Sequence, residues 1–177
     1  MKHLEIELKT LLKKEDYDHL KEQFSHIQPV LQKNYYIDTP DFQLREKKVA
    51  MRIRTFSDWA ELTLKVPQTV GNMEYNQKLN LPEAESYLEK QTLPQGLVLE
   101  KLTKIGIESH DWLILGCLAT IRYEMETSIG LMALDESHYF NHTDYELELE
   151  VTNHEKGKAD FQRFLDENQI TYQKAPS

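Results

Sequence analysis

The stretch Asp144-Tyr-Glu-Leu-Glu-Leu-Glu-Val151 places a carboxylate at every second residue and a large apolar or aromatic side chain between them. A period of two is typical of a β-strand with one apolar and one polar face. The same alternation predicts further strands at Leu4–Lys9, Met51–Arg54, Ala60–Val66, Met73–Leu79 and Thr120–Glu126. The chain is therefore expected to be rich in amphipathic strands.

Other segments follow the period of three to four residues that is typical of helices. Apolar side chains recur at such steps from Tyr17 to Ile27, and Pro29 is expected to end this helix. Three more helices are predicted over Glu83–Gln91, Leu97–Ile107 and Glu155–Asn168. Because the strands come in runs, the pattern favours an α+β fold with a mostly antiparallel sheet. No linker divides the chain, so we expect a single domain over residues 1–177.

Charge is distributed unevenly along the chain. Its 177 residues include 21 Lys and Arg against 30 Asp and Glu, a net charge of −9. Residues 1–78 have a net charge of +1 and residues 79–177 a net charge of −10. An acidic protein is a poor general partner for nucleic acid. The asymmetry suggests that charge is placed by position.

The cellular compartment is predicted from the cysteine content and from the length of the apolar stretches. Cys117 is the single cysteine, so no intramolecular disulfide forms. The longest apolar stretch, Trp112–Ile121, is about half the length of a membrane-spanning helix. The first residues lack the apolar run of a signal peptide. We expect a cytoplasmic protein without a membrane partner, and a homodimer is left open.

The polar faces of the predicted strands carry almost only full charges. One interpretation is an open sheet with its polar face in water, which is the commoner arrangement. However, residues two apart on a strand lie only about 7 Å apart, so Glu146, Glu148 and Glu150 would form a row of like charges. The alternative is a closed barrel with a charged lumen and helices outside. The charged positions are Glu5, Glu7, Lys9, Arg52, Arg54, Glu61, Lys65, Glu74, Lys78, Arg122, Glu124, Glu126, Asp144, Glu146, Glu148 and Glu150.

Two chemical groups can be distinguished among these side chains. The carboxylates of the first and last strands are the hard oxygen ligands that Mg²⁺ or Mn²⁺ prefers; they are Glu5, Glu7, Glu146, Glu148 and Glu150. The cations can clamp phosphate oxygens; they are Lys9, Arg52, Arg54, Lys65, Lys78 and Arg122. Together they form an inventory for binding a polyphosphate chain with its metal.

Several motifs give the chain a family resemblance. Glu5-Ile-Glu-Leu-Lys9 resembles the Glu-x-Glu-x-Lys signature of the CYTH domain, the triphosphate tunnel metalloenzymes. Further motifs of that family resemble Tyr36-Ile-Asp38-Thr39, Met51-Arg-Ile-Arg54, Leu62-Thr-Leu-Lys65, Thr120-Ile-Arg122, Leu134-Asp135 and Glu146-Leu-Glu-Leu-Glu150. The likeness spans residues 3–152 and is greatest to an uncharacterised branch from Gram-positive bacteria. Around Glu74-Tyr-Asn76 the family is often richer in Arg and Glu, so this chain departs from it there.

The resemblance implies an eight-stranded antiparallel barrel and a divalent-metal-dependent reaction at a triphosphate. It implies that Asp135 joins the metal ligands, although a turn-capping role is the plainer alternative for an Asp there. Lys9 is either a phosphate ligand or a general base, with Tyr36 assisting it, and Glu148 belongs to the row that would hold the metal of the attacking water. The segment that contains His138 and His142 is predicted as a turn between strands, which argues against a zinc site.

The residues and the resemblance are consistent with three functions. The leading one is hydrolysis of inorganic triphosphate or of an organic triphosphate. The second is a class IV adenylate cyclase, which would also need an adenine site that the sequence does not specify. The third is a non-catalytic sensor of polyphosphate or nucleotide. The complete glutamate row favours an enzyme, because binding alone would need only the cations.

Overall fold

A computed structural model describes residues 1–176. Its strands are β1 (Lys2–Leu12), β2 (Val30–Asp38), β3 (Ala50–Thr55), β4 (Trp59–Pro67), β5 (Asn72–Asn80), β6 (Leu113–Thr127), β7 (Gly130–Tyr139) and β8 (His142–Val151). Its helices are α1 (Lys14–Gln23), α2 (Gln43–Glu46), α3 (Leu81–Lys90), α4 (Leu97–Lys104) and α5 (His154–Glu167). The strands form a closed antiparallel barrel in the hydrogen-bonded order β1-β5-β4-β3-β2-β6-β7-β8. The predicted fold class is thereby confirmed.

Two strands, β2 and β7, were absent from the strands predicted by alternation alone, and their burial explains why. On β2 the buried positions include Gln32 and Asn34, so burial there does not follow hydrophobicity. On β7 the consecutive residues Met132, Ala133 and Leu134 are all buried, and the apolar and polar residues no longer alternate. Periodicity detects strands with one apolar and one polar face, and neither of these strands has that pattern.

Contacts divide the chain into two compact units, although strands β1, β2 and β6 contribute residues to both. The first unit comprises Met1–Leu4 and Gln32–Leu118, and the second comprises Glu5–Leu31 and residues 119–176. The expectation of a single domain stays a prediction.

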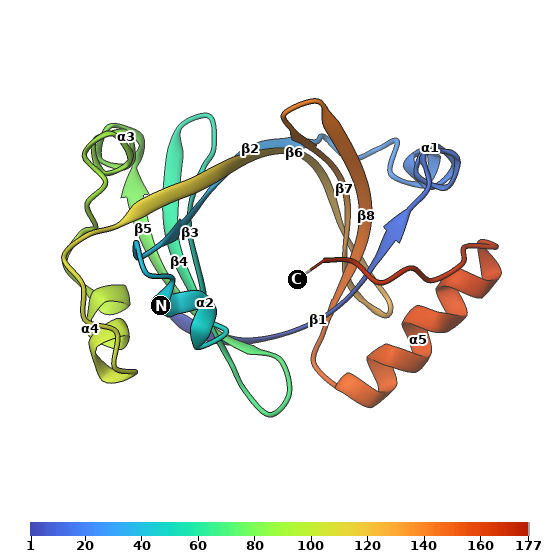
Figure 1. Ribbon diagram of the computed structural model, residues 1–177. Helices are drawn as coiled ribbons and strands as arrows, with labels where there is room; N and C mark the ends of the chain where they lie inside the picture. The colour runs from blue at the N-terminus through green and yellow to red at the C-terminus, as the bar shows by residue number, and fades with distance from the viewer. Residues whose placement is uncertain (177) are drawn as a thin grey trace. The chain divides into compact units, whose positions relative to one another are not determined.

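In the first unit, helices α3 and α4 pack on the apolar side of the β3-β4-β5 meander (Figure 1). Leu62 and Leu64 of β4 are fully buried with Val98 of α4. Helix α3 begins at a capping box, in which Asn80 Oδ1 accepts from the Glu83 backbone N–H at 2.8 Å and Glu83 Oε1 accepts from the Asn80 N–H. The helices thus cover one side of the meander and leave the charged side to line the barrel.

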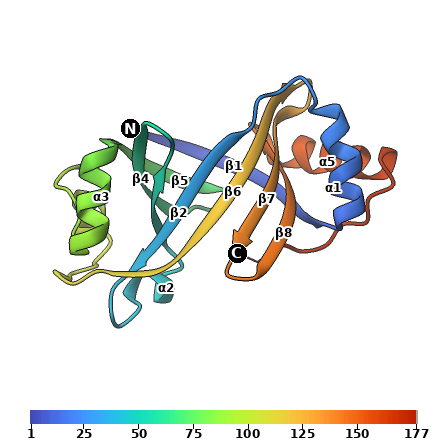
Figure 2. The same cartoon turned by 90° about the horizontal axis from the view of Figure 1, so that it is seen from above.

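In the second unit, helices α1 and α5 lie on the same side of β7 and β8 (Figures 1 and 2). Leu20 of α1 and Leu165 of α5 pack with Leu147 and Leu149 of β8, and all four are fully buried. The intervening glutamates of β8 therefore lie on the side opposite the helices, because successive side chains of a strand alternate between its faces. Among the described residues, no helix is long and apolar enough to cross a membrane.

Candidate active site

The charged face of the second unit is organised around β8. In the ladder with β1, Lys9 lies opposite Glu148 and Glu7 lies opposite Glu150. Directly opposite residues of an antiparallel pair have Cβ atoms only about 5 Å apart. The ladder with β7 places Asp135 opposite Glu146. Charged residues predicted from the first and last strands are thus brought together on one face.

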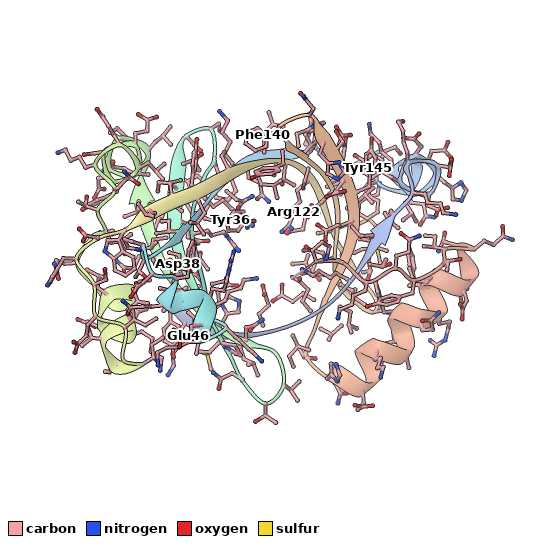
Figure 3. All side chains as sticks on the ribbon, viewed as in Figure 1. Tyr36, Asp38, Glu46, Arg122, Phe140 and Tyr145 are labelled. Carbon is pink, nitrogen blue, oxygen red and sulfur yellow. The ribbon has the colours of Figure 1, made fainter. Side chains whose placement is uncertain are left out.

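Arg122 of β6 is the most strongly bonded cation on this face. Its Nε and Nη2 donate to the two oxygens of Asp135 at 2.8 and 2.7 Å, and Nη2 also donates to Glu148 Oε2 at 3.0 Å. Burial opposes the charge of Arg122, but the hydrogen bond to Asp135 and the negative charges of Asp135 and Glu148 outweigh it and raise its pKa. Figure 3 shows Arg122 on the side of β7 and β8 away from α1, and Tyr145 on the side next to α1. Arg122 is therefore a fixed positive group on the charged face.

A small residue lets Arg122 reach across β7. Ala133 lies opposite Glu124 in one ladder and opposite Glu148 in the other. It is 5% exposed, and its methyl group leaves the space above β7 open to the guanidinium. Sequence reasoning missed this position, because an alanine in a strand has no chemical signal of its own.

The pKa of Glu146 reflects the other carboxylates that lie close to it. Burial and the neighbouring charge of Glu148 raise the pKa of Glu146. Partly buried carboxylates beside one another are stabilised by a divalent cation, and oxygen donors of this kind fit Mg²⁺ or Mn²⁺. The carboxylates of this face include Glu7, Asp135, Glu146, Glu148 and Glu150, and Glu5 precedes Glu7 by two residues on β1.

The structure confines the predicted turn between strands to two residues and excludes the turn-capping role for Asp135. Asp135 is 4% exposed and lies in the middle of β7, so it caps no turn. His138 also belongs to β7, and His142 begins β8; only Phe140 and Asn141 form the turn between them. The error arose because buried Asp135 and Ser137 occupy strand positions with residue types that are common in turns.

The first unit has a charged face of a different kind. Arg54 Nε donates to Asn34 Oδ1 at 2.6 Å, and Arg54 lies opposite Asn34 between β3 and β2. Arg52 lies opposite Tyr36, which is 37% exposed. The Nε of Arg52 is buried, and it has no hydrogen-bond partner within residues 1–176. Arg52 and Arg54 thus lie beside neutral residues of β2, and on β4 Arg52 lies opposite Thr63 and Arg54 lies opposite Glu61.

Strands β4 and β5 complete this second charged face. Lys65 lies opposite Glu74, with Nζ 3.7 Å from Glu74 Oε2, and Glu74 is 7% exposed. Thr63 Oγ1 donates to Asn76 Oδ1 at 2.7 Å. A ring nitrogen of His3 and a carboxylate oxygen of Glu74 lie within 4.8 Å of each other. The departure from the family pattern at Glu74-Tyr-Asn76 is therefore a buried polar cluster.

Lys78 lies at the exposed end of this row. It is opposite Glu61 in the β4-β5 ladder, and its Nζ lies 5.3 Å from the centre of the Trp59 ring. Sequence reasoning found the charged members of the face. It missed Asn34, Thr63 and Asn76, because buried neutral polar residues do not differ from ordinary strand residues in a sequence.

The comparisons with known proteins agree with this architecture. The family model of the CYTH domain matches residues 3–177, and the chain belongs to the CYTH domain family. The "Putative triphosphatase YjbK" of Bacillus subtilis is 37% identical over 169 residues, which cover 94% of this chain and 87% of that protein.

Two solved structures are similar to this chain over nearly its whole length. The crystal structure of a "putative adenylate cyclase" of Bacillus halodurans is 36% identical, has a TM-score of 0.92, and the match covers 99% of this chain and 95% of the other. A "putative adenylyl cyclase" of Hippeastrum, described as having a dominant triphosphatase activity, has a TM-score of 0.80 at 22% identity, over 98% of this chain and 92% of that one. The second match shows the shared fold.

Proposed function

We propose that this protein hydrolyses triphosphates with the help of a divalent metal ion. The observation that carries the proposal is Arg122, which Asp135 and Glu148 hold in place beside a row of partly buried carboxylates. Fixed cations and metal ligands on one face are what phosphoryl transfer requires, because catalysis there consists of positioning and charge stabilisation. The name of the Bacillus subtilis relative supports the same activity.

The metal would be held by the carboxylates of the second unit. We assign Glu146, Glu148 and Glu150 to it, together with Glu5 and Glu7 of β1. Both oxygens of Asp135 already accept hydrogen bonds from Arg122, so Asp135 acts first by orienting that guanidinium. Mg²⁺ or Mn²⁺, when bound, supplies positive charge to the phosphate oxygens and acidifies a water molecule.

The cations of both units are proposed as phosphate ligands. In the second unit these are Lys9 and Arg122; in the first they are Arg52, Arg54, Lys65 and Lys78. Water adds to the terminal phosphorus, the bond to the bridging oxygen breaks, and inorganic triphosphate yields phosphate and pyrophosphate. We favour a phosphate-binding role for Lys9, because it lies opposite Glu148. A pH–rate profile that keeps its shape in Lys9→Arg would exclude general-base catalysis by Lys9 and with it the assistance of Tyr36.

Adenylate cyclase is the second candidate, since the Bacillus halodurans relative carries that description. Both reactions use the same phosphate and metal ligands and differ in the attacking group. A cyclase releases pyrophosphate and cyclic AMP from ATP, whereas a triphosphatase releases phosphate. Product analysis therefore separates them.

The test measures phosphate release from inorganic triphosphate, ATP and thiamine triphosphate, with Mg²⁺ or Mn²⁺, at neutral and alkaline pH. Glu148→Gln should lower kcat by about 100-fold, because it removes a metal ligand and a partner of Arg122. Glu155→Gln is the matched control, since the Glu155 side chain is 88% exposed on α5. Release of phosphate from none of these compounds, or an equal loss in both variants, would refute the proposal. Binding without turnover would identify a sensor.

The cellular setting is part of the same proposal. We infer a cytoplasmic enzyme, because Cys117 is the single cysteine and a soluble triphosphate is the expected substrate. Its partners are this small molecule and its metal ion, with no nucleic acid and no membrane.

A further inference from the structure

The β7-β8 hairpin ends in an aromatic pair that the proposed chemistry does not use. Tyr139 ends β7, Phe140 follows in the turn, and their ring centres lie 4.6 Å apart. Phe140 is 90% exposed and Tyr139 is 42% exposed. Phe140 is labelled in Figure 3. Aromatic rings stabilise a protein mainly when they are buried, so a ligand that covers Tyr139 and Phe140 would explain their position at the hairpin tip.

The turn itself would be served better by another residue. Tyr139 lies opposite His142, so the loop has two residues, and Phe140 has a φ of 51°. Glycine or asparagine is preferred at such a position, because a Cβ disfavours positive φ. An aromatic residue here therefore carries a conformational cost, and retained strain of this kind is a pointer to function.

The ladder connects this tip with the phosphate-binding face. Asp135, Ser137 and Tyr139 lie on the same face of β7, because side chains alternate and the pairing with β8 has no bulge between these positions. Tyr139 is four residues from Asp135, which corresponds to about 13 Å along the strand. That separation is similar to the distance between the terminal phosphate and the base of an extended nucleoside triphosphate.

The tip is also braced. His138 Nε2 lies 2.6 Å from Glu136 Oε2, and the His138 Nδ1 pairs with Thr143 Oγ1 at 3.1 Å. The contact with Thr143 ties β7 to β8 on the face opposite Tyr139, and the contact with Glu136, also on β7, orients the His138 ring. The aromatic pair is thus presented on a fixed hairpin end.

We propose that Tyr139 and Phe140 bind the flat heteroaromatic ring of an organic triphosphate by stacking, while its phosphate chain occupies the face that contains Arg122. This inference rests on the proposed function and specifies its substrate class as an organic triphosphate. Stacking on aromatic side chains tolerates different rings, because every such ring has a π-face. A nucleobase and the rings of thiamine are both compatible with it.

The test compares ATP and thiamine triphosphate with inorganic triphosphate in Phe140→Gly. Glycine suits the turn, so this variant removes the ring without harming the hairpin. The KM for the preferred organic triphosphate should rise about tenfold, whereas kcat/KM for inorganic triphosphate should stay within about twofold. Phe140→Trp should restore the wild-type KM. Phe42→Gly is the matched control, because Phe42 is also exposed and has a φ of 56°; it should change neither substrate.

Each other result has a defined meaning. Equal effects of Phe140→Gly on all substrates, or no effect on either organic one, would overturn the stacking role and leave the triphosphatase proposal standing. If the wild type hydrolyses no triphosphate, the proposed function fails. The stacking role is then judged from equilibrium binding of intact ATP and thiamine triphosphate. Weaker binding of either in Phe140→Gly, with inorganic triphosphate bound as before, supports it; unchanged binding of both overturns it.

Discussion

The charged faces of the two units differ in what surrounds their cations. In the first unit, Arg54 bonds to the amide of Asn34 and Arg52 lies opposite Tyr36. In the second, Arg122 is bonded to two carboxylates, Asp135 and Glu148. The first face has four cations to two carboxylates, and the second has two cations to nine. The cations of the first are Arg52, Arg54, Lys65 and Lys78, with Glu61 and Glu74; the second has Lys9 and Arg122 with Glu5, Glu7, Glu124, Glu126, Asp135, Asp144, Glu146, Glu148 and Glu150.

Similar alternating strands can thus produce charged faces with different ratios of cations to carboxylates. Cations outnumber carboxylates on the first face, so this face contributes net positive charge for phosphate oxygens. Carboxylates outnumber cations on the second face, and a bound cation reduces their mutual repulsion, so this face suits a metal ion.

The largest effect is expected from removing a charge at Arg122. Arg122→Met leaves the buried Asp135 and the partly buried Glu148 without their cation, and the free energy of unfolding should fall by about 3–5 kcal/mol. Arg54→Met removes a hydrogen bond to a neutral amide and the cation that lies opposite Glu61, so its loss should be smaller, about 1–3 kcal/mol. Urea denaturation of both variants measures the difference. Equal losses would show that the two faces hold their arginines alike.

An intermediate effect is expected at Glu146, whose pKa is raised above its ordinary value of 4.5. The folded protein therefore binds this proton more readily than the unfolded chain, and Glu146 loses stabilising influence as the pH rises through its folded pKa. Glu146→Gln should be more stable to heat than wild type at pH 7, with the gap closing as the pH falls toward 4.5.

The same variant tests metal binding. Mg²⁺ or Mn²⁺ should raise the melting temperature of the wild type more than that of Glu146→Gln, because a ligand stabilises the state that binds it. Glu155→Gln again serves as the control. An equal shift in all three proteins would remove Glu146 from the metal site.

The smallest effect is expected at Ala133. Ala133→Val adds two methyl groups under the path of Arg122 toward Glu148, so kcat/KM should fall by about tenfold with the hydrogen bonds to Asp135 retained. The matched control is Ala119→Val, because Ala119 also belongs to the β6-β7 pairing but lies opposite His138, away from the path between Arg122 and Glu148. A wild-type rate for Ala133→Val would show that Arg122 does not need this space.

Much of the architecture could be predicted because strand and helix periods are local. The alternation of Glu146-Leu-Glu-Leu-Glu150 identified β8 and its charged face, and the helices α3, α4 and α5 were placed within a few residues. Strand β7 was not, since Met132, Ala133 and Leu134 are all buried and show no alternation. The candidate metal and phosphate ligands were identified by charge, whereas the neutral residues that orient them were not.

The sequence by itself determined which side chains share a face along each strand, because the side-chain period of a strand is two. It also determined the supply of carboxylates and cations. Only the tertiary structure decided their neighbours: Lys9 lies opposite Glu148, and Arg122 reaches the same glutamate across Ala133. The physical reason is that sheet partners are chosen by strand order and register. These depend on how the apolar faces pack under the helices, and no local stretch of sequence contains that information.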